Sequence, residues 1–181
     1  MNGIDVVNIR LVKDKTLYSQ TPIINTKTAA DVLAEELRYY DREVLAVVNL
    51  QSDLKPININ IVSMGLVNAT IASPSQIFKS AILSNASCIM MLHNHPSGTV
   101  TPSKPDIDVT KRILLCGKLM GIELIDHIIV GDNERYSFAE EGMIEKFKKE
   151  VNQSLITQKS SVFEKMVMQP AEIYPEVQIE F

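Results

Sequence analysis

The spacing of hydrophobic and polar residues changes several times along the chain, and these changes predict the elements of the fold. Short apolar or alternating runs that are rich in β-branched residues predict strands. Such runs occupy residues 6–12, 43–50, 57–65, 87–92 and 122–131. The second and third runs are joined by the stretch QSDLKP, which favours a turn, so these two strands are predicted to form a hairpin.

Apolar residues recur with helical spacing between these strands. Residues 26–40 are predicted to form a helix of about three turns, with Thr26 or Thr28 as its cap. Residues 106–121 are predicted to form a helix that stops at Gly121, because glycine readily adopts the conformation that ends a helix.

A further helix is predicted after the hairpin. Ser73 is its expected cap and Pro74 its first residue, since the first turn does not need the amide hydrogen that proline lacks. One face of this helix is predicted to carry four apolar residues, namely Ile77, Phe78, Ala81 and Ile82. Strands that alternate with helices indicate an α/β (α+β) fold.

The length of 181 residues gives room for one domain, which is assigned to residues 1–150. Residues 151–181 are expected to form a C-terminal helix or tail. The helical pattern in this part begins near Tyr136 and fades near Ser160, and a looser segment with Pro170 and Pro175 follows.

Composition narrows the possible functions. The chain is 45% hydrophobic and 22% charged, as is typical of a folded globular protein. A net charge of −4 and a pI near 5.4 do not describe a surface that neutralises phosphates, so nucleic acid is disfavoured as the main ligand. No stretch has the pattern of a signal peptide or the length of a transmembrane helix, so a cytoplasmic protein without a membrane partner is expected. Cys88 and Cys116 lack CxxC spacing and are expected to be buried, reduced thiols.

Candidate chemistry is concentrated in the stretch LHNHPSGTVTPSKPD, which carries two of the three histidines. His93 and His95 lie at positions i and i+2 at the end of a predicted strand, so their side chains point to the same side. The loop 96–102 can fold back and bring Asp106, in the first turn of the next helix, to the two imidazoles. Two nitrogen ligands and one oxygen ligand suit Zn²⁺ and leave a fourth position for water.

The same residues have a purely structural interpretation. Ser103 and Asp106 match the capping box of a helix N-terminus, in which the two side chains bond each other's backbone amides. An isolated H-x-H pair is more often a pair of polar loop residues than a metal site. The joint spacing of the two patterns favours the metal site.

That joint spacing, H-x-H followed by seven residues and S-x-x-D, resembles the signature of the JAMM (JAB1/MPN/Mov34) metallopeptidases. The stretches HNHPSG, TPSKPDIDVTKR and GIELIDHIIVG resemble the RadC-type bacterial branch of that superfamily, and the likeness covers about residues 43–141. The resemblance implies a mixed β-sheet flanked by helices, the JAB/MPN fold of cytidine-deaminase-like type.

The resemblance also implies roles for individual residues. His93, His95 and Asp106 match the zinc ligands, and Ser103 matches the serine that stabilises the oxyanion. The stretch REVLAVVNL resembles the strand that carries the glutamate base, which selects Glu43. The sequence alone does not separate Glu43 from the two glutamates of the preceding helix, Glu35 and Glu36.

The function implied is a zinc-dependent peptidase or isopeptidase that acts on a protein or peptide. The alternative is a non-catalytic JAB-domain binding module, or an accessory protein of DNA repair or of a mobile element of the RadC type. The chain departs from the RadC branch in having SPSQIF where a PRE-like helix start is common, and it carries no helix-hairpin-helix segment. His127 is expected to be a packed, hydrogen-bonded residue outside the site, or a partner of one ligand. Asp108 is expected to point away from Asp106.

Overall fold

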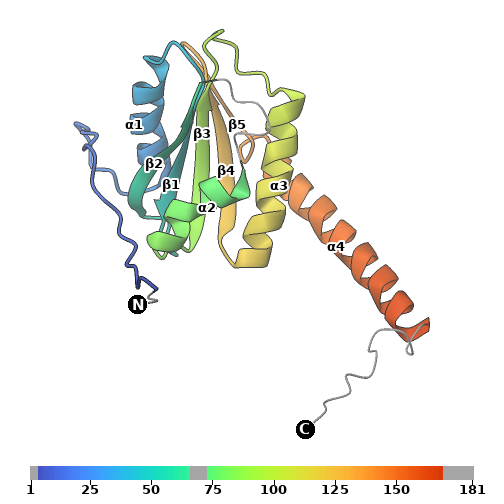
Figure 1. The fold of residues 1–181 in the computed structure, drawn as a ribbon. Helices are drawn as coiled ribbons and strands as arrows, with labels where there is room; N and C mark the ends of the chain where they lie inside the picture. Colours follow the sequence, from blue (N-terminus) through green and yellow to red (C-terminus); the bar gives the residue numbers. More distant parts are fainter. Residues whose placement is uncertain (1–3, 66–72, 169–181) are drawn as a thin grey trace.

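Figure 1 shows the computed structural model of the chain, which describes residues 4–65 and 73–168. Residues 156–168 are described by their backbone alone. Within these residues, five strands form one sheet in the order β2–β1–β3–β4–β5. The strands are β1 Val44–Leu50, β2 Pro56–Met64, β3 Cys88–Asn94, β4 Glu123–Val130 and β5 Arg135–Ser137.

The sheet is mixed. β3 and β4 pair in parallel, whereas β1 pairs antiparallel with both β2 and β3, and β5 pairs antiparallel with β4. The predicted hairpin of β1 and β2 is therefore confirmed, as is the predicted α/β fold with a mixed sheet. The parallel connection between β3 and β4 runs through a helix, as such connections generally do.

Helices cover both faces of this sheet (Figure 1). They are α1 Thr26–Arg38, α2 Pro74–Leu83, α3 Lys104–Met120 and α4 Met143–Met168. Alternate residues of β1 divide between two hydrophobic clusters, because side chains alternate along a strand. Val44, Ala46 and Val48 pack in the cluster that contains α1, and Leu45 and Val47 pack in the cluster that contains residues of α2, α3 and α4. All residues of β1 and β3 are buried for this reason.

The helices α1, α2 and α3 form where the sequence predicts them, but the N-cap of α1 and the buried face of α2 differ from the prediction. The N-cap of α1 is Asn25 rather than Thr26 or Thr28, and its side chain accepts a hydrogen bond from the Thr28 amide at 2.9 Å. Pro74 begins α2 as predicted, but Ile82 is 56% exposed because it lies off the stripe formed by the other three apolar residues. The predicted stop of α3 at Gly121 is confirmed, with φ at +70°.

The strand predicted at residues 6–12 is wrong. This segment belongs to no strand or helix, and Val6 and Val12 are 94% and 88% exposed. The segment has the β-branched residues that favour a strand, but a strand also needs a neighbouring strand that supplies hydrogen bonds. None of the described strands pairs with this segment.

The C-terminal prediction is also revised. Tyr136 lies in β5, and α4 begins only at Met143, after Gly142 in a left-handed conformation with φ at +69°. The helix continues past Ser160 to Met168. The looser segment with Pro170 and Pro175 lies outside the described residues. Among the described helices, none combines the length and the apolar character that a membrane crossing requires.

Candidate metal centre

The two motif histidines lie at the end of β3. Leu45 of β1 is paired with His93, so His93 points to the same side of the sheet as Leu45, toward α2 and α3. His93 is 2% exposed and His95 is partly buried. Their Nε2 atoms lie 3.0 Å apart, which confirms that the i, i+2 spacing brings both imidazoles to one side.

Asp106 completes the group from the first turn of α3. Its Oδ1 atom lies 3.2 Å from His93 Nε2, and its Oδ2 atom lies 3.5 Å from His95 Nε2. The loop between His95 and Ser103 therefore folds back as the sequence predicted. The carboxylate is 6% exposed, so the three side chains form a nearly closed group at the C-terminal end of a central strand.

These distances fit a metal ion. In a tetrahedral site with bonds of about 2.0–2.1 Å, neighbouring ligand atoms lie roughly 3.3 Å apart. The Nε2 atoms of His93 and His95, 3.0 Å apart, lie near that value, and each is within 3.5 Å of one of the two Asp106 oxygens. Because two imidazole nitrogens and one carboxylate oxygen converge in this way, His93, His95 and Asp106 can hold a metal ion.

The close packing of His93, His95 and Asp106 shifts the pKa values of Asp106 and His95. Burial alone would raise the pKa of the Asp106 carboxyl, but its close contacts with the imidazoles of His93 and His95 lower that pKa far below its usual range. The hydrogen bond with Asp106 in turn raises the pKa of His95, against the opposing effect of burial. These contacts therefore favour the carboxylate form of Asp106, the form that can bind a metal ion.

Ser103 makes contact with Asp106 rather than with a histidine. Its hydroxyl donates to Asp106 Oδ2 at 2.5 Å and accepts from the Asp106 amide at 3.3 Å, while the Ser103 amide donates to the same carboxylate oxygen at 2.7 Å. This is a capping box. Both interpretations of S-x-x-D hold together, because one carboxylate oxygen faces His93 while the other closes the helix N-terminus.

The loop after β3 fixes His95. The His95 amide donates to the Val130 carbonyl at 2.9 Å, and His95 Nδ1 lies 2.9 Å from the Thr99 carbonyl oxygen. A carbonyl oxygen only accepts, so Nδ1 carries a ring hydrogen, and Nε2 is the atom that faces Asp106. Gly131 allows the loop to lie this close, because a Cβ atom at that position would be 2.3 Å from the Gly98 oxygen.

Glu43 comes immediately before β1. In the antiparallel register of β1 and β3 Leu45 is paired with His93, so Glu43 is two residues from a residue that faces a motif histidine. The negative charge of Glu43 contributes to the raised pKa of His95, although less than the contact with Asp106 does. Glu35 and Glu36 lie on α1, which covers the opposite face, so the structure places only Glu43 of the three beside the metal group.

Asn94 connects the histidine strand to the backbone around Glu43. Its side-chain oxygen accepts a hydrogen bond from the Val44 amide at 2.8 Å, and its side-chain nitrogen donates to the Arg42 carbonyl at 3.0 Å. The residue between the two histidines thus holds the peptide groups on both sides of Glu43. This role could not be read from the sequence, because the contact spans 50 residues.

We expect Asn94→Ala to lower the free energy of unfolding by about 1–3 kcal/mol, because the buried Val44 amide loses its acceptor. Urea denaturation measures this effect. Asn152→Ala is the matched control, since Asn152 is an exposed residue of α4 and its loss should change stability by less than about 0.5 kcal/mol. Equal stability of Asn94→Ala and the native chain would contradict the role given to Asn94.

His127 of β4 is part of the same cluster. Its Nε2 atom lies 2.8 Å from His93 Nδ1, and its Nδ1 atom lies 2.7 Å from the Thr110 hydroxyl. Burial lowers the pKa of His127 well below the ordinary value, so the ring is neutral. Of the two possibilities left open by the sequence, the structure shows a direct contact with a motif histidine. The sequence did contain one indication of this contact, because His127 is a histidine in a predicted strand that is otherwise mostly apolar.

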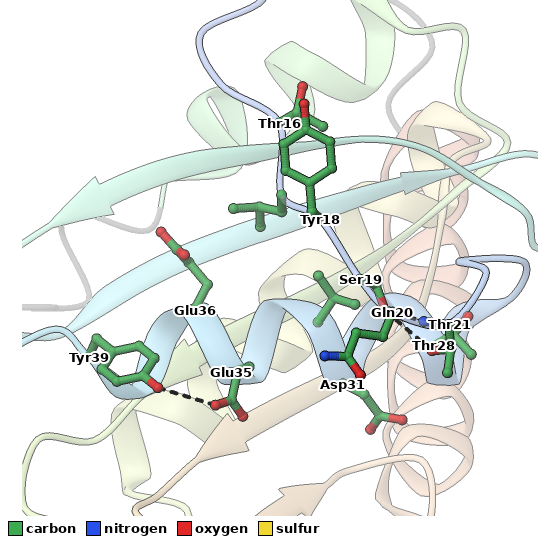
Figure 2. Close-up of a pocket in the computed structure, with 12 residues that line it drawn as sticks. Thr16, Tyr18, Ser19, Gln20, Thr21, Thr28, Asp31, Glu35, Glu36 and Tyr39 are labelled. Carbon is green, nitrogen blue, oxygen red and sulfur yellow. Dashed lines mark hydrogen bonds between the residues drawn. The ribbon is translucent and has the colours of Figure 1, made fainter.

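A separate groove of about 520 Å³ lies on the outer side of α1 (Figure 2). It is formed by residues 16–21 and by polar and acidic residues of the helix, among them Asp31, Glu35 and Glu36. It shares no residue with the metal group, and α1 lies against the other face of the sheet. This groove and the candidate chemistry are therefore in different places.

Fold and site together define a class of protein: a mixed-sheet α/β domain with a His-His-Asp group at the end of a central strand. Residues 23–143 match the sequence model of the RadC-like JAB domain, and the chain belongs to this family.

Similar proteins support this assignment. A UPF0758 protein of Desulfitobacterium hafniense is 44% identical over 124 residues, which cover 68% of this chain and 55% of that protein. A UPF0758 protein of Moorella thermoacetica is 40% identical over 126 residues, covering 70% of this chain and 55% of the relative. A UPF0758 protein of Alkaliphilus metalliredigens is 41% identical over 139 residues, which cover 75% of this chain and 60% of that protein. The chain therefore matches little more than half of the length of these relatives.

Proposed function

We propose that this chain is a zinc-dependent metallopeptidase or isopeptidase that hydrolyses an amide bond of a protein or peptide. The observation that carries the proposal is the convergence of His93, His95 and Asp106 at ligand spacing, with Glu43 near enough for its charge to raise the pKa of His95. Two nitrogen donors and one oxygen donor suit Zn²⁺, and three protein ligands are typical of catalytic zinc sites, whereas structural sites have four. A binding module would not require this set together with an adjacent carboxylate.

The residues of the chain have distinct roles in this proposal. A bound zinc ion would lower the pKa of a water molecule toward neutrality and polarise the substrate carbonyl. Glu43 would accept a proton from the attacking water and return it to the leaving amine. Glu43 directly precedes β1 and His95 directly follows β3, and these adjacent strands keep the base close to the ligand set.

Ser103 is proposed to donate a hydrogen bond to the oxyanion that forms at the substrate carbonyl. In the structure its hydroxyl hydrogen is directed at Asp106 Oδ2. Donation to the substrate therefore requires the hydroxyl to rotate, while the Ser103 amide keeps its own bond to Asp106. A well-placed donor of this kind contributes roughly 3–4 kcal/mol to the stability of the transition state.

We expect Ser103→Ala to lower kcat by about 10²- to 10³-fold through loss of this donor. It should also lower the free energy of unfolding by about 1 kcal/mol, because Ser103 caps α3. Steady-state kinetics and urea denaturation separate the two effects. The matched control is Ser73→Ala, since Ser73 precedes α2 without a capping hydrogen bond from its side chain. A variant with unchanged kcat and reduced stability would leave Ser103 with the capping role alone.

A direct test incubates the zinc-loaded protein with a peptide library and with isopeptide-linked conjugates, and detects products by mass spectrometry. New amine and carboxylate ends that disappear with Glu43→Gln would support the proposal. If no substrate is cleaved and the protein instead binds DNA with a steep dependence on salt, the alternative of a DNA-associated accessory protein would replace it.

A further inference from the structure

We infer that His127 and Thr110 are positioning residues that hold His93 in the tautomer whose Nε2 lone pair faces the metal. The inference rests on the metal centre of the proposed function and does not depend on hydrolysis. The structure places the two residues in a continuous line of hydrogen bonds that begins at the backbone of Asp106 and ends at His93.

The direction of the line is set at its first link. The Thr110 hydroxyl lies 2.5 Å from the backbone oxygen of Asp106. A carbonyl oxygen only accepts, and a hydroxyl has a single hydrogen, so that hydrogen is directed at Asp106. At its second contact, 2.7 Å from His127 Nδ1, the Thr110 oxygen must accept. The ring hydrogen of His127 is therefore on Nδ1.

The second link transfers this constraint to the metal ligand. With its one hydrogen on Nδ1, His127 presents an unprotonated Nε2 atom to His93 Nδ1 at 2.8 Å. His93 must donate there, so its own hydrogen is on Nδ1. Its Nε2 atom, 3.2 Å from Asp106 Oδ1, then carries the lone pair that a metal requires.

The surroundings keep this arrangement in place. His127 and Thr110 are 1% and 0% exposed, so water has little access to replace either link. Phe138 stacks on the His127 ring with an interplanar angle of 7° and a centroid distance of 5.1 Å, which fixes the plane of the imidazole. His95 is oriented separately by the Thr99 carbonyl, so this line of bonds serves His93 alone.

Two substitutions of Thr110 test the inference. Thr110→Val keeps the shape of the side chain and removes the oxygen that accepts from His127 Nδ1. We expect the single hydrogen of the His127 ring to move to Nε2, where it is donated to His93 Nδ1. The hydrogen of His93 then moves to its own Nε2 atom and points into the metal group. Competition with a chromophoric chelator should show zinc affinity about 10- to 100-fold weaker than in the native protein. Thr110→Ser restores the hydroxyl and should restore the affinity. Native affinity in Thr110→Val would overturn the inference.

A second readout needs no metal. Nitrogen-15 NMR of the zinc-free protein, at a pH well above the ordinary imidazole pKa, distinguishes the two tautomers of each ring. We expect Nδ1–H for both His93 and His127 in the native chain, and Nε2–H for both in Thr110→Val. An Nε2–H tautomer of His93 in the native chain would overturn the inference even if the variant fails to fold. Absence of zinc binding by the native chain would instead count against the proposed function and leave the tautomer result standing.

Discussion

Glu43→Gln is expected to retain zinc and lose about 10²- to 10⁴-fold in hydrolytic rate, the range over which a general base contributes to catalysis. The substitution keeps the size of the side chain and removes its ability to accept a proton. Since Glu43 is outside the ligand group, zinc content should remain that of the native protein. Single-turnover hydrolysis and metal analysis of the same preparation measure the two quantities.

Glu36→Gln is the control for this experiment. Glu36 is a glutamate of α1, on the other face of the sheet, where it pairs with Lys15. Its substitution should leave the hydrolytic rate unchanged. A Glu43→Gln variant that keeps both zinc and the full rate would remove Glu43 from the mechanism.

Asp106→Ala is expected to abolish the stabilisation of the fold by zinc. A metal that binds only the folded state adds about 2.7 kcal/mol at a concentration one hundred times its dissociation constant, so zinc should raise the Tm of the native chain. In the variant one ligand and one half of the α3 capping box are lost together. The Tm without metal should fall modestly, and the shift on adding zinc should vanish. Differential scanning calorimetry with and without zinc measures both.

Asp108→Ala provides the matched control, because Asp108 lies two residues further along α3 and is exposed. It should show the native shift in Tm on addition of zinc. An equal shift in Asp106→Ala would mean that zinc binds elsewhere on the chain.

Much of the metal group could be predicted from the sequence because its geometry is local. His93 and His95 share a side of one strand, and Ser103 and Asp106 share one helix turn, so spacing alone constrains each pair. The loop that joins the pairs is short enough to bring them together. The strands β1 to β4 and the helices α1 to α3 followed from the same kind of local periodicity, whereas β5 did not.

The remaining contacts depend on pairing between distant segments. The proximity of Glu43 to His95 depends on the pairing of β1 with β3, which no local pattern sets. The contact of His127 with His93 needs β4 to lie beside β3, and the Thr110 link needs α3 to lie over both strands. The segment 6–12 shows the converse, since a strand-like pattern without a neighbouring strand formed none.

The most direct test of the account is the zinc content of the native chain, purified without chelators or nickel affinity and measured by mass spectrometry of metals beside His95→Ala. The account predicts about one zinc ion per native chain and almost none in the variant, because three converging ligands are needed to hold the ion. No zinc in the native chain, even after reconstitution, would contradict the metal centre and with it the proposed hydrolase.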